Sequence, residues 1–350
     1  MSIAIDGIVF SLQRAGGISV YFQELLRVLG QRGDAATLTL ETPHRQELLH
    51  PSSSVAVHPI AARRLERYRA ARVPMPSSVF HSSYYRRPDQ PGVPTVVTVY
   101  DFIYERFRTG PARWAHTAQK NAAIRSAQAV ICISESTRQD MLQWIGETPG
   151  QQVHVVHCGV GEGFHPLGLE RSGPPALLYI GERGGYKNFR LALQALALLP
   201  DCRLDCVGGG PLRPEELAEF PPAVRDRVRH LGFVTDEQLN ERYNQAACLV
   251  YPSSYEGFGI PPLEAMRAGC PVVCIECAAV LEIGAGALTI AESAEPDALA
   301  RAIARTLEPA YRADIVARGL AVSARYSWRE AHARTLEIYG TLADVARPAR

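Results

Sequence analysis

The sequence predicts an α/β protein built from two doubly wound domains with parallel sheets. Short runs of β-branched and aliphatic residues alternate with segments of helical periodicity through both halves of the chain. This alternation is typical of parallel sheets covered by helices on both faces. The length of 350 residues also exceeds what one hydrophobic core usually supports, which favours two domains.

In the first half, strands are predicted at residues 3–5, 55–57, 95–99, 129–133 and 153–157. After the first strand, Gly16 and Gly17 interrupt the chain before a helix whose apolar residues recur at helical spacing. After the fourth strand, Ser136 and Gln139 fit a capping box that would begin a further helix. The first half therefore reads as one α/β domain.

The second half repeats this pattern after a Gly- and Pro-rich stretch at 159–175, which is the best candidate for a linker. Strands are predicted at 176–181, 202–207, 228–234, 248–253 and 270–274, with helices at 189–199, after a Thr235–Gln238 capping box, and at 261–269. An amphipathic helix is predicted over 328–345. The predicted domains are residues 1–165 and 166–327, followed by a terminal helical segment, 328–350.

Composition excludes several classes of protein. The net charge of +1 provides no strong field for binding DNA or RNA, so no nucleic-acid partner is expected. The first residues, MSIAIDGIVF, do not resemble a signal peptide, and no apolar run approaches the roughly 18 residues of a membrane span. We expect a cytoplasmic protein that is at most peripheral on the inner face of the cell membrane.

Five arginines are concentrated in residues 63–72, at Arg63, Arg64, Arg67, Arg69 and Arg72. A charge run of this kind usually forms the solvated face of a helix. The alternative is a surface that meets anionic lipid or a phosphorylated acceptor. Both interpretations stay open at the level of the sequence.

Cys270, Cys274 and Cys277 have a spacing that some iron–sulfur enzymes use. Cys270 and Cys274, however, are the first and last residues of the run CPVVC. This run reads as a buried strand directly after a helix rather than as an open loop. Packing in the core is therefore favoured, and the sequence predicts no metal site.

The most informative segment is YPSSYEGFGIPPLEAMRAG, residues 251–269. Gly257 and Gly259 allow backbone to approach a ligand closely, and the prolines that follow suit the first turn of a helix. A helix N-terminus offers N–H donors to an anion. Glu256 and Glu264 would flank that anion as acceptors for hydroxyl groups, and a nucleotide sugar has hydroxyls on both sides of its diphosphate. Balance of the helix dipole alone would explain Glu264 but not the whole arrangement.

The run EGFGIPPLE resembles the E-(x)7-E signature of retaining glycosyltransferases with the GT-B fold, specifically glycosyltransferase family four. Further segments resemble this family in the same order: DGIVFSLQRAGGISVYFQEL, YIGERGGYKNF, GGGPL, GFVTDEQL, AGCPVV and YSWREAHARTLEIY. The resemblance implies two Rossmann-like domains whose parallel sheets face across a cleft, with the terminal helix crossing back to the first domain. It also makes the first domain the acceptor side and the second the donor side.

The resemblance also implies roles for individual residues. Arg183 and Lys187 correspond to the basic pair that contacts the donor diphosphate, and fixed cations there would stabilise the charge of the leaving group. The chain contains only two lysines, Lys120 and Lys187. Glu256 corresponds to the glutamate that contacts the hexose, and Glu264 to the one that contacts the ribose. The other implied donor contacts are Gly16, Gly17, Gly209, Phe233, Val234, Phe258, Gly259 and Glu282.

The acceptor side departs from the family's pattern. Tyr100 stands where the family often has a histidine, which makes the following Asp101 a candidate for catalysis or for contact with acceptor or sugar. His81 begins a polar, aromatic loop that also contains Tyr84 and Arg86, and these three are candidate acceptor contacts. A lone histidine is as readily structural as functional. Leu281 replaces a proline that usually precedes the residue equivalent to Glu282.

The function implied is transfer of a hexose, with retention, from a nucleotide sugar to a glycan or lipid-linked oligosaccharide in surface-polysaccharide (O-antigen) synthesis. GDP-mannose or a GDP-deoxyhexose is the favoured donor, and no metal or other cofactor is expected. The alternatives are a GT-B sugar-nucleotide epimerase and a non-catalytic protein that binds nucleotide sugars or glycans. A nicotinamide-dependent dehydrogenase is disfavoured because GGGPLRPEE lacks the third glycine of a dinucleotide-binding loop.

Overall fold

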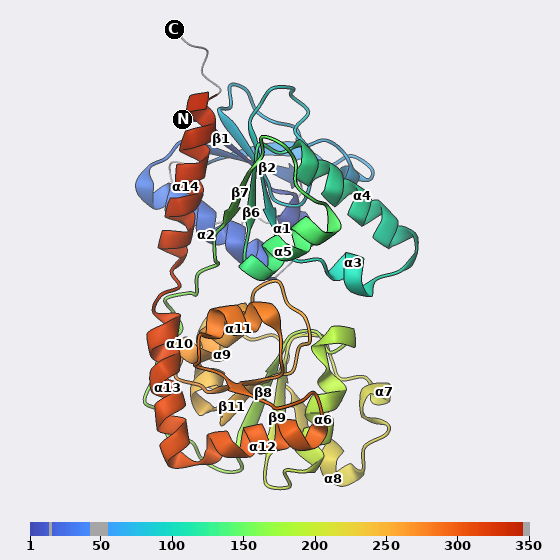
Figure 1. Ribbon diagram of the computed structural model, residues 1–350, viewed down its shortest axis with the longest axis vertical. Helices are drawn as coiled ribbons and strands as arrows, with labels where there is room; N and C mark the ends of the chain where they lie inside the picture. The colour runs from blue at the N-terminus through green and yellow to red at the C-terminus, as the bar shows by residue number, and fades with distance from the viewer. Residues whose placement is uncertain (14–15, 43–54, 346–350) are drawn as a thin grey trace. The chain divides into compact units, whose positions relative to one another are not determined.

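The computed structural model describes residues 1–13, 16–42 and 55–345. They form two compact units: unit 1 comprises Met1–Gly159 and Trp328–Arg350, and unit 2 comprises Val160–Ser327 (Figure 1). Residues 346–350 of the predicted terminal segment lie outside the described residues. Each unit has a parallel sheet covered by helices, as the alternating pattern predicts.

Unit 1 contains a seven-stranded parallel sheet in the order β3-β2-β1-β4-β5-β6-β7. Its strands are β1 (Ile3–Asp6), β2 (Ala36–Thr42), β3 (Val55–Ala61), β4 (Val79–Ser82), β5 (Thr95–Val99), β6 (Ala129–Cys132) and β7 (Gln152–Val155). The direction of winding reverses between β1 and β4, which pair in parallel through Ile3–Val79, Ala4–Phe80 and Ile5–His81. The carboxyl ends of these two strands thus form the switch point of the sheet, where such folds bind ligands.

The helices of unit 1 include one that comes from the far end of the chain. They are α1 (Ile8–Leu12), α2 (Gly17–Arg32), α3 (Ile103–Phe107), α4 (Gly110–Ser126), α5 (Glu135–Trp144) and α14 (Trp328–Val345). Helix α14, red in Figure 1, packs against α2, β4 and β6. It buries Trp328, Leu336, Ile338, Tyr339 and Leu342, each worth about 1.5–3 kcal/mol when taken from water. The terminal helix therefore belongs to the core of unit 1.

Unit 2 contains a six-stranded parallel sheet in the order β10-β9-β8-β11-β12-β13. Its strands are β8 (Ala176–Ile180), β9 (Arg203–Val207), β10 (Val228–His230), β11 (Cys248–Tyr251), β12 (Val272–Cys274) and β13 (Thr289–Ile290). Its helices are α6 (Phe189–Ala197), α7 (Pro214–Leu217), α8 (Pro222–Arg225), α9 (Asp236–Gln245), α10 (Ile260–Arg267), α11 (Ala278–Gly284), α12 (Pro296–Leu307) and α13 (Pro309–Ser323). The winding of this sheet reverses between β8 and β11.

Local signals succeed where a cap is well defined and fail where composition is ambiguous. The capping box of Thr235 and Gln238 begins α9 as predicted. The capping box at Ser136 is wrong: the cap lies two residues earlier, at Ser134, which accepts a hydrogen bond from the Thr137 N–H at 2.9 Å. The helix face proposed for 63–72 is also wrong, because the only helical turn there is the 3₁₀ turn Glu66–Tyr68.

Cys270, Cys274 and Cys277 are buried free thiols in the core of unit 2. Among the described residues, no three side chains of His, Cys, Asp or Glu are grouped so that they could hold a metal ion. In the same part of the chain, no helix combines the length and the apolar character needed to cross a membrane.

Candidate active site

Two of the predicted donor residues, Lys187 and Glu256, lie at the switch point of unit 2, where the loops after β8 and β11 are side by side. The Ser254 N–H donates to the Tyr186 carbonyl at 2.9 Å, and the Asn188 side-chain amide donates to the Pro252 carbonyl at 2.9 Å. These two bonds hold the loop that carries Lys187 against the loop that carries Glu256. Carboxyl ends at a switch point are the usual ligand position of an open parallel sheet.

Lys187 and Glu256 meet directly at this point. The Lys187 Nζ lies 2.5 Å from Glu256 Oε1, and their side chains are 15% and 11% exposed. The same ammonium lies 5.4 Å from the centre of the Tyr251 ring, and the Tyr251 hydroxyl lies near the Glu256 carboxylate. Lys120, the other lysine of the chain, is fully buried beside Glu105. Lys187 is therefore the lysine whose ammonium a ligand can reach.

The start of α10 has the predicted form. Gly259 precedes the helix with φ of 122°, and a Cβ at this position would lie 3.0 Å from Ile283 Cδ1, so both backbone and space favour glycine. Pro261 and Pro262 occupy the first turn, and Phe258 is buried with its ring edge-on to Tyr326. Because the two prolines lack N–H groups, this helix start offers an anion fewer donors than most. More of the charge balance for a diphosphate must then come from Lys187.

Glu264 lies within α10, half-buried. Its Oε2 accepts a hydrogen bond from the Tyr243 hydroxyl at 2.9 Å. Burial raises the pKa of the Glu264 carboxyl to about 7, Tyr243 acts in the opposite direction, and the nearby Asp236 carboxylate raises it slightly further. Glu264 can therefore change protonation state near neutral pH.

Arg183 has a different environment from Lys187. Its side chain is 2% exposed and forms an ion pair with Glu216, with Nε 3.0 Å from Oε1. The guanidinium also donates to the carbonyls of Gly208, Gly209 and Pro211 at 2.8–3.1 Å. Gly209 has φ of +69°, and a Cβ there would lie 2.7 Å from Arg183 Nη1. Arg183 thus holds the glycine loop after β9 through its guanidinium.

The other predicted donor contacts of unit 2 lie on neighbouring elements. Phe233 is 86% exposed in the loop between β10 and α9, and Val234 beside it is half-buried. Glu282 is half-buried on α11. An exposed phenylalanine ring at the carboxyl edge of the sheet offers a flat apolar face to a base.

In unit 1, Gly16 and Gly17 form the start of α2, where Gly16 is the cap and its carbonyl accepts from the Val20 N–H at 3.0 Å. Asp101 is half-buried after β5. Its Oδ1 accepts from the Ile103 N–H at 3.0 Å, which begins α3, and its carbonyl accepts from Lys120. The structure thus gives Asp101 local backbone partners just before α3, at the carboxyl edge of the first sheet.

His81 and Tyr84 lie within packed surroundings in unit 1. His81 is 0% exposed, with its ring nitrogens bonded to the Tyr339 hydroxyl and, at 2.8 Å, to Thr98 Oγ1. Burial lowers the pKa of His81 to about 3, so the ring is neutral. The half-buried Tyr84 has its hydroxyl 3.4 Å from both Arg67 Nη2 and His116 Nε2. The structure therefore places His81 in the core, where it joins β4 to α14.

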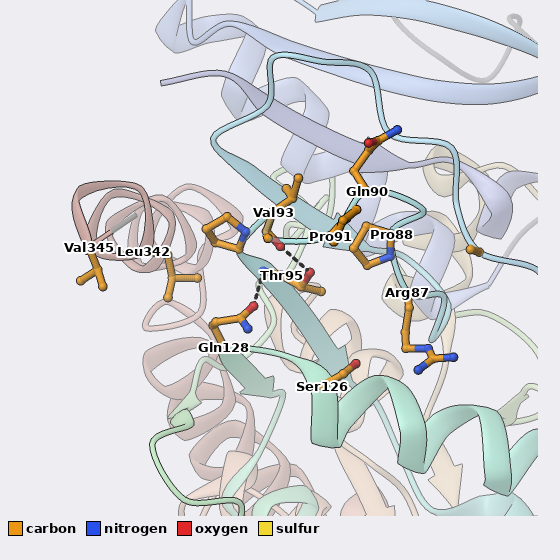
Figure 2. A pocket seen from close by; sticks show the side chains of 13 residues that line it. Arg87, Pro88, Gln90, Pro91, Val93, Thr95, Ser126, Gln128, Leu342 and Val345 are labelled. Carbon is orange, nitrogen blue, oxygen red and sulfur yellow. Dashed lines mark hydrogen bonds between the residues drawn. The ribbon is translucent and has the colours of Figure 1, made fainter. Parts of the chain in front are cut away.

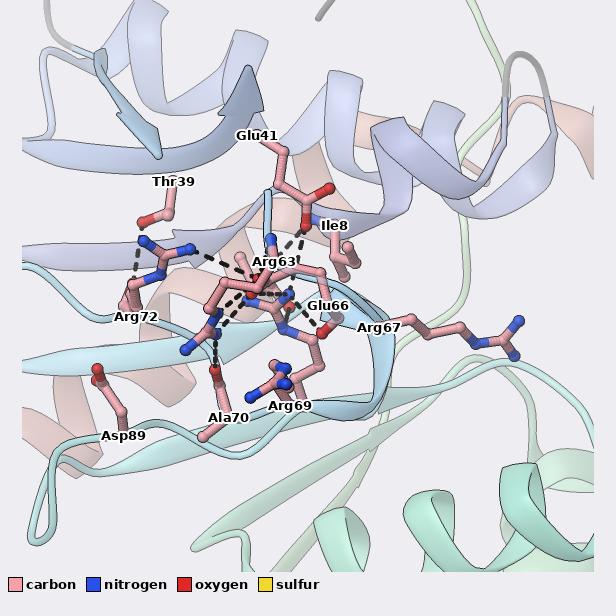
Figure 3. Close-up of polar contacts among 12 residues, drawn as sticks. Ile8, Thr39, Glu41, Arg63, Glu66, Arg67, Arg69, Ala70, Arg72 and Asp89 are labelled. Atoms are coloured by element: carbon pink, nitrogen blue, oxygen red, sulfur yellow. Dashed lines mark hydrogen bonds and ion pairs between the residues drawn. The ribbon is translucent and has the colours of Figure 1, made fainter. Parts of the chain in front are cut away.

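Arg86 is the centre of a buried ionic cluster. It is 2% exposed and pairs with Asp6, Glu41 and Glu66 at 3.3, 3.6 and 3.2 Å. Arg63 binds Glu66 with Nε 2.7 Å from Oε2, and Figure 3 shows Arg63, Glu66 and Glu41 gathered together. Burial raises the pKa of Asp6 to about 6, whereas hydrogen bonds from Arg63 lower that of Glu66 to about 2. Arg86 is thus engaged by carboxylates and has no face open to an acceptor.

A hollow of about 430 Å³ lies at the opposite, amino end of β5 in unit 1 (Figure 2). It is lined by Pro88, Pro91, Pro94 and Leu342 among others, and none of the predicted site residues lines it. Beside it the Thr95 N–H donates to Gln128 Oε1 at 2.8 Å. This hollow is distinct from the donor residues of unit 2.

Three residues near the candidate donor glutamates, Tyr243, Tyr251 and Asp236, have no signal in the sequence that marks them as functional. Tyr251 is the last residue of a buried strand, and Tyr243 occupies an inward position of a helix, so both read as core aromatics. Their hydroxyls meet Glu264 and Glu256, respectively. Only the folded arrangement shows that each glutamate of the E-(x)7-E segment has its own tyrosine.

Two protein-family models match the chain. The one described as "Glycosyltransferase Family 4" matches residues 15–162, and the one described as "Glycosyl transferases group 1" matches residues 174–309. The first match lies in unit 1 apart from its last three residues, and the second lies in unit 2. The second also contains the complete segment from Glu256 to Glu264.

Curated relatives carry glycosyltransferase names. The chain is 36% identical to the O-antigen chain mannosyltransferase B of Escherichia coli over 238 residues, which are 63% of this chain and 62% of the relative. It is 27% identical to the serotype-specific mannosyltransferase WbdA of the same species over 67% of this chain, but this match spans only 32% of WbdA. The D-inositol 3-phosphate glycosyltransferase of Streptosporangium roseum is 25% identical over 95% of this chain and 90% of its own.

Solved structures resemble the chain over nearly its full length. The sucrose-phosphate synthase of Thermosynechococcus elongatus has a TM-score of 0.80 at 20% identity, covering 99% of this chain and 100% of its own. WaaG, a glycosyltransferase involved in lipopolysaccharide biosynthesis, has a TM-score of 0.71 at 14% identity, covering 97% and 99%. At these identities the likeness shows the fold, which is GT-B. With the two family matches along the chain, this protein belongs to glycosyltransferase family four.

Proposed function

We propose that this protein transfers a hexose, with retention of configuration, from a nucleotide sugar to a glycan or lipid-linked glycan of a surface polysaccharide. The observation that carries the proposal is the Lys187–Glu256 pair at the switch point of unit 2. A donor diphosphate can replace Glu256 as the partner of the Lys187 ammonium. The Glu256 carboxylate is then available to accept hydrogen bonds from hexose hydroxyls. Glu264, eight residues further on, would accept from the ribose, and Phe233 would pack against the base.

In the mechanism that we favour, the bond between the anomeric carbon and the donor phosphate oxygen breaks as the acceptor oxygen attacks the same face. The acceptor proton passes to the departing phosphate oxygen, and the nucleoside diphosphate leaves. Lys187 contributes by neutralising the charge that grows on the diphosphate. Removal of such a group lowers the rate by about 10²–10³. We propose that no metal ion takes part, so transfer should persist in EDTA.

GDP-mannose, or a related GDP-deoxyhexose, is the donor that we propose. The mannosyltransferase names of the Escherichia coli relatives support the sugar. Asp236 supports the base: it is the first residue of α9, close enough to Glu264 to raise that residue's pKa. A carboxylate here could accept two hydrogen bonds from the N1–H and N2–H₂ groups of guanine, whereas uracil offers one N–H between two carbonyls.

A thermal-shift series with GDP, UDP and dTDP tests the donor directly. A ligand at 100 times its Kd stabilises the folded protein by about 2.7 kcal/mol, so the preferred nucleotide should stand out. Transfer from the matching nucleotide sugar should then be measured for the wild type and Lys187→Ala. Conversion of the donor without any transfer would favour an epimerase, and tight binding without turnover would favour a binding protein.

We also propose that the protein contacts an anionic membrane at the run 63–72. Of the five arginines in this run, Arg64 and Arg69 would make the contact. Arg63 and Arg72 are bound to Glu66 and to the Ala70 and Ala61 carbonyls. Arg64 and Arg69 remain exposed, beside Leu65 and Tyr68, which are 65% and 48% exposed. Arginine beside exposed apolar residues suits a lipid headgroup layer, at about 1 kcal/mol per charge.

Sedimentation with phosphatidylglycerol vesicles tests this contact. The double variant Arg64→Glu/Arg69→Glu should bind at least tenfold more weakly, and Arg225→Glu, an exposed arginine of unit 2, should bind as the wild type does. Binding that is unchanged in the double variant, or absent in the wild type, would remove the membrane from the proposal.

A further inference from the structure

A buried tyrosine lies beside each glutamate of the segment from Glu256 to Glu264, but the two pairs differ. Glu256 is bound by the Lys187 ammonium and also lies near the Tyr251 hydroxyl. Among the described residues, Glu264 has a single side-chain partner, the Tyr243 hydroxyl at 2.9 Å from Oε2. Any control of the orientation of Glu264 by another side chain therefore rests on Tyr243.

Tyr243 cannot itself touch a ligand. It projects from α9 with 0% exposure, and its ring packs edge-on to Phe164 with the centroids 5.9 Å apart. Its hydroxyl lies 3.3 Å from the Pro261 carbonyl as well as 2.9 Å from Glu264. A tyrosine has one proton to donate, and the charged acceptor at the shorter distance takes it.

We propose that Tyr243 is a positioning residue for the donor: it holds one oxygen of Glu264 so that the other can accept hydrogen bonds from the hydroxyls of the donor nucleoside. The proposal rests on the proposed function for the identity of the ligand. It assigns a role to a residue of α9 that lies 21 positions before Glu264 and outside the E-(x)7-E segment.

The same bond favours the charged form of Glu264. Burial raises the pKa of this carboxyl to about 7, and the hydrogen bond from Tyr243 opposes that rise. Asp236, Tyr251 and Cys270 also act on the pair, and none of them is a cation. The charged side chains of α11 and α13, which pack against α10, are Glu282, Arg312, Asp314 and Arg318; Arg312 donates to the Ala246 and Ala247 carbonyls and Arg318 pairs with Asp314.

The substitution Tyr243→Phe removes the hydroxyl and keeps the ring. Without this donor, the pKa of Glu264 should rise, and more of the carboxyl should be protonated at pH 7. We expect GDP to bind about tenfold more weakly at pH 7, with much of the loss recovered at pH 8.5–9, where the carboxyl ionises again. The KM for the donor should rise in parallel, whereas kcat should change little because the hydroxyl is remote from the reacting atoms.

Isothermal titration with GDP between pH 5.5 and 9 measures this effect, with UDP as the probe if the wild type binds UDP instead. In the wild type, affinity should weaken as the pH falls through about 7. In Tyr243→Phe the midpoint should move to higher pH. Tyr311→Phe is the matched control, because its hydroxyl bonds to Thr289 at 3.1 Å in the same unit, away from the donor residues. It should leave both affinity and midpoint unchanged.

Glu264→Gln provides the second test, because it removes the titrating group. It should abolish the pH step, and adding Tyr243→Phe to it should weaken GDP binding by much less than tenfold. A Tyr243→Phe protein with a lower Tm but the wild-type pH midpoint would overturn the proposal, as would a pH step that persists in Glu264→Gln. A wild type that binds no nucleoside diphosphate would instead overturn the proposed function.

Discussion

Both units have ionisable residues near the carboxyl ends of their parallel strands. The partners and the exposure of these residues differ between the units. In unit 1, Arg86 is surrounded by Asp6, Glu41 and Glu66, and His81 has a protein partner at each nitrogen. In unit 2, Lys187 and Glu256 retain 15% and 11% exposure. Of these ion pairs, the Lys187–Glu256 pair keeps the exposure that exchange of a partner for a ligand would need.

The difference shows that pairing alone does not identify a ligand site. A fully buried ion must have permanent partners inside the protein, since removing one leaves an uncompensated charge. A pair that water still reaches can open, because water or a phosphate replaces the lost contact. Exposure of the pair, more than its type or distance, therefore separates the structural edge of unit 1 from the candidate donor edge of unit 2.

The largest expected effect concerns the buried side of this comparison. Arg86→Met should reduce the free energy of unfolding by about 3–5 kcal/mol, because Asp6, Glu41 and Glu66 would lose their shared cation. Urea denaturation followed by circular dichroism measures this. Arg87→Met changes an exposed neighbour and should cost less than about 0.5 kcal/mol. Equal stability of the two variants would mean that the cluster is not structural.

Substitution of the accessible Lys187 should affect turnover more than stability. Lys187→Ala should lower kcat by about 10²–10³ while leaving Tm close to that of the wild type, because the ammonium is partly exposed and its loss leaves no deeply buried charge. Arg183→Ala should lower Tm instead, since it frees three carbonyls and Glu216. Arg190→Ala, which removes a 69% exposed side chain, is the control for turnover. A Lys187→Ala enzyme with full turnover would exclude Lys187 from catalysis.

A smaller effect would sharpen the comparison by identifying the ligand of the accessible edge. Asp236→Asn should reduce the preference for GDP over UDP by about tenfold, since asparagine replaces one of the two acceptor oxygens with an NH₂ donor that would face a guanine N–H. Competition between the two nucleotides in a thermal-shift or calorimetric titration measures this ratio. Glu237→Gln changes the adjacent carboxylate and should preserve it. An unchanged ratio in Asp236→Asn would mean that Asp236 does not select the base.

The smallest expected effect is the pH dependence of unit 1. The pKa of Asp6 is raised from 3.8 to about 6, so between these values the folded protein holds a proton that the unfolded chain has released. The contribution of Asp6 to stability therefore grows as the pH falls through this range. The difference in Tm between Asp6→Asn and the wild type should shift in favour of the variant as the pH rises from 5 to 7.

Glu66 should behave in the opposite way and serves as the comparison for Asp6. Its pKa is lowered to about 2, so its contribution is present above its ordinary value of 4.5 and is lost as the pH falls towards 2. Glu66→Gln should consequently cost stability at pH 5–7. If both variants respond to pH in the same direction, the carboxylates of the cluster do not have the separate environments described above.

Sequence patterns predicted what depends on neighbours along the chain. The capping box of Thr235, the prolines that begin α10 and the amphipathic helix 328–345 follow from spacing, and each is observed. Strands β2 and β4 were not predicted, although both are central to unit 1. β4 spans only Val79–Ser82 and includes His81, whose burial depends on Tyr339, 258 residues away.

For the candidate donor site, the sequence pointed to residue types but not to their arrangement. The motif brought Lys187 and Glu256 to attention, and the structure adds their direct contact. The sequence could not show that Arg183 binds Glu216 and three carbonyls, because those partners come from a different loop. Nor could the run 63–72 reveal that its single carboxylate, Glu66, binds Arg63, Arg72 and Arg86.

The position of α14 has a consequence for the biosynthesis of the protein. Unit 2 is continuous in sequence, so its core is complete once residue 327 has been translated. Unit 1 receives Trp328 and Tyr339 only after that, although its other strands were made first. At 5–20 residues per second, the intervening ~170 residues delay the completion of unit 1 by roughly 10–30 s. During that interval the nascent chain lacks the helix that covers α2, β4 and β6, so the apolar residues of this surface stay open to water until α14 has been made.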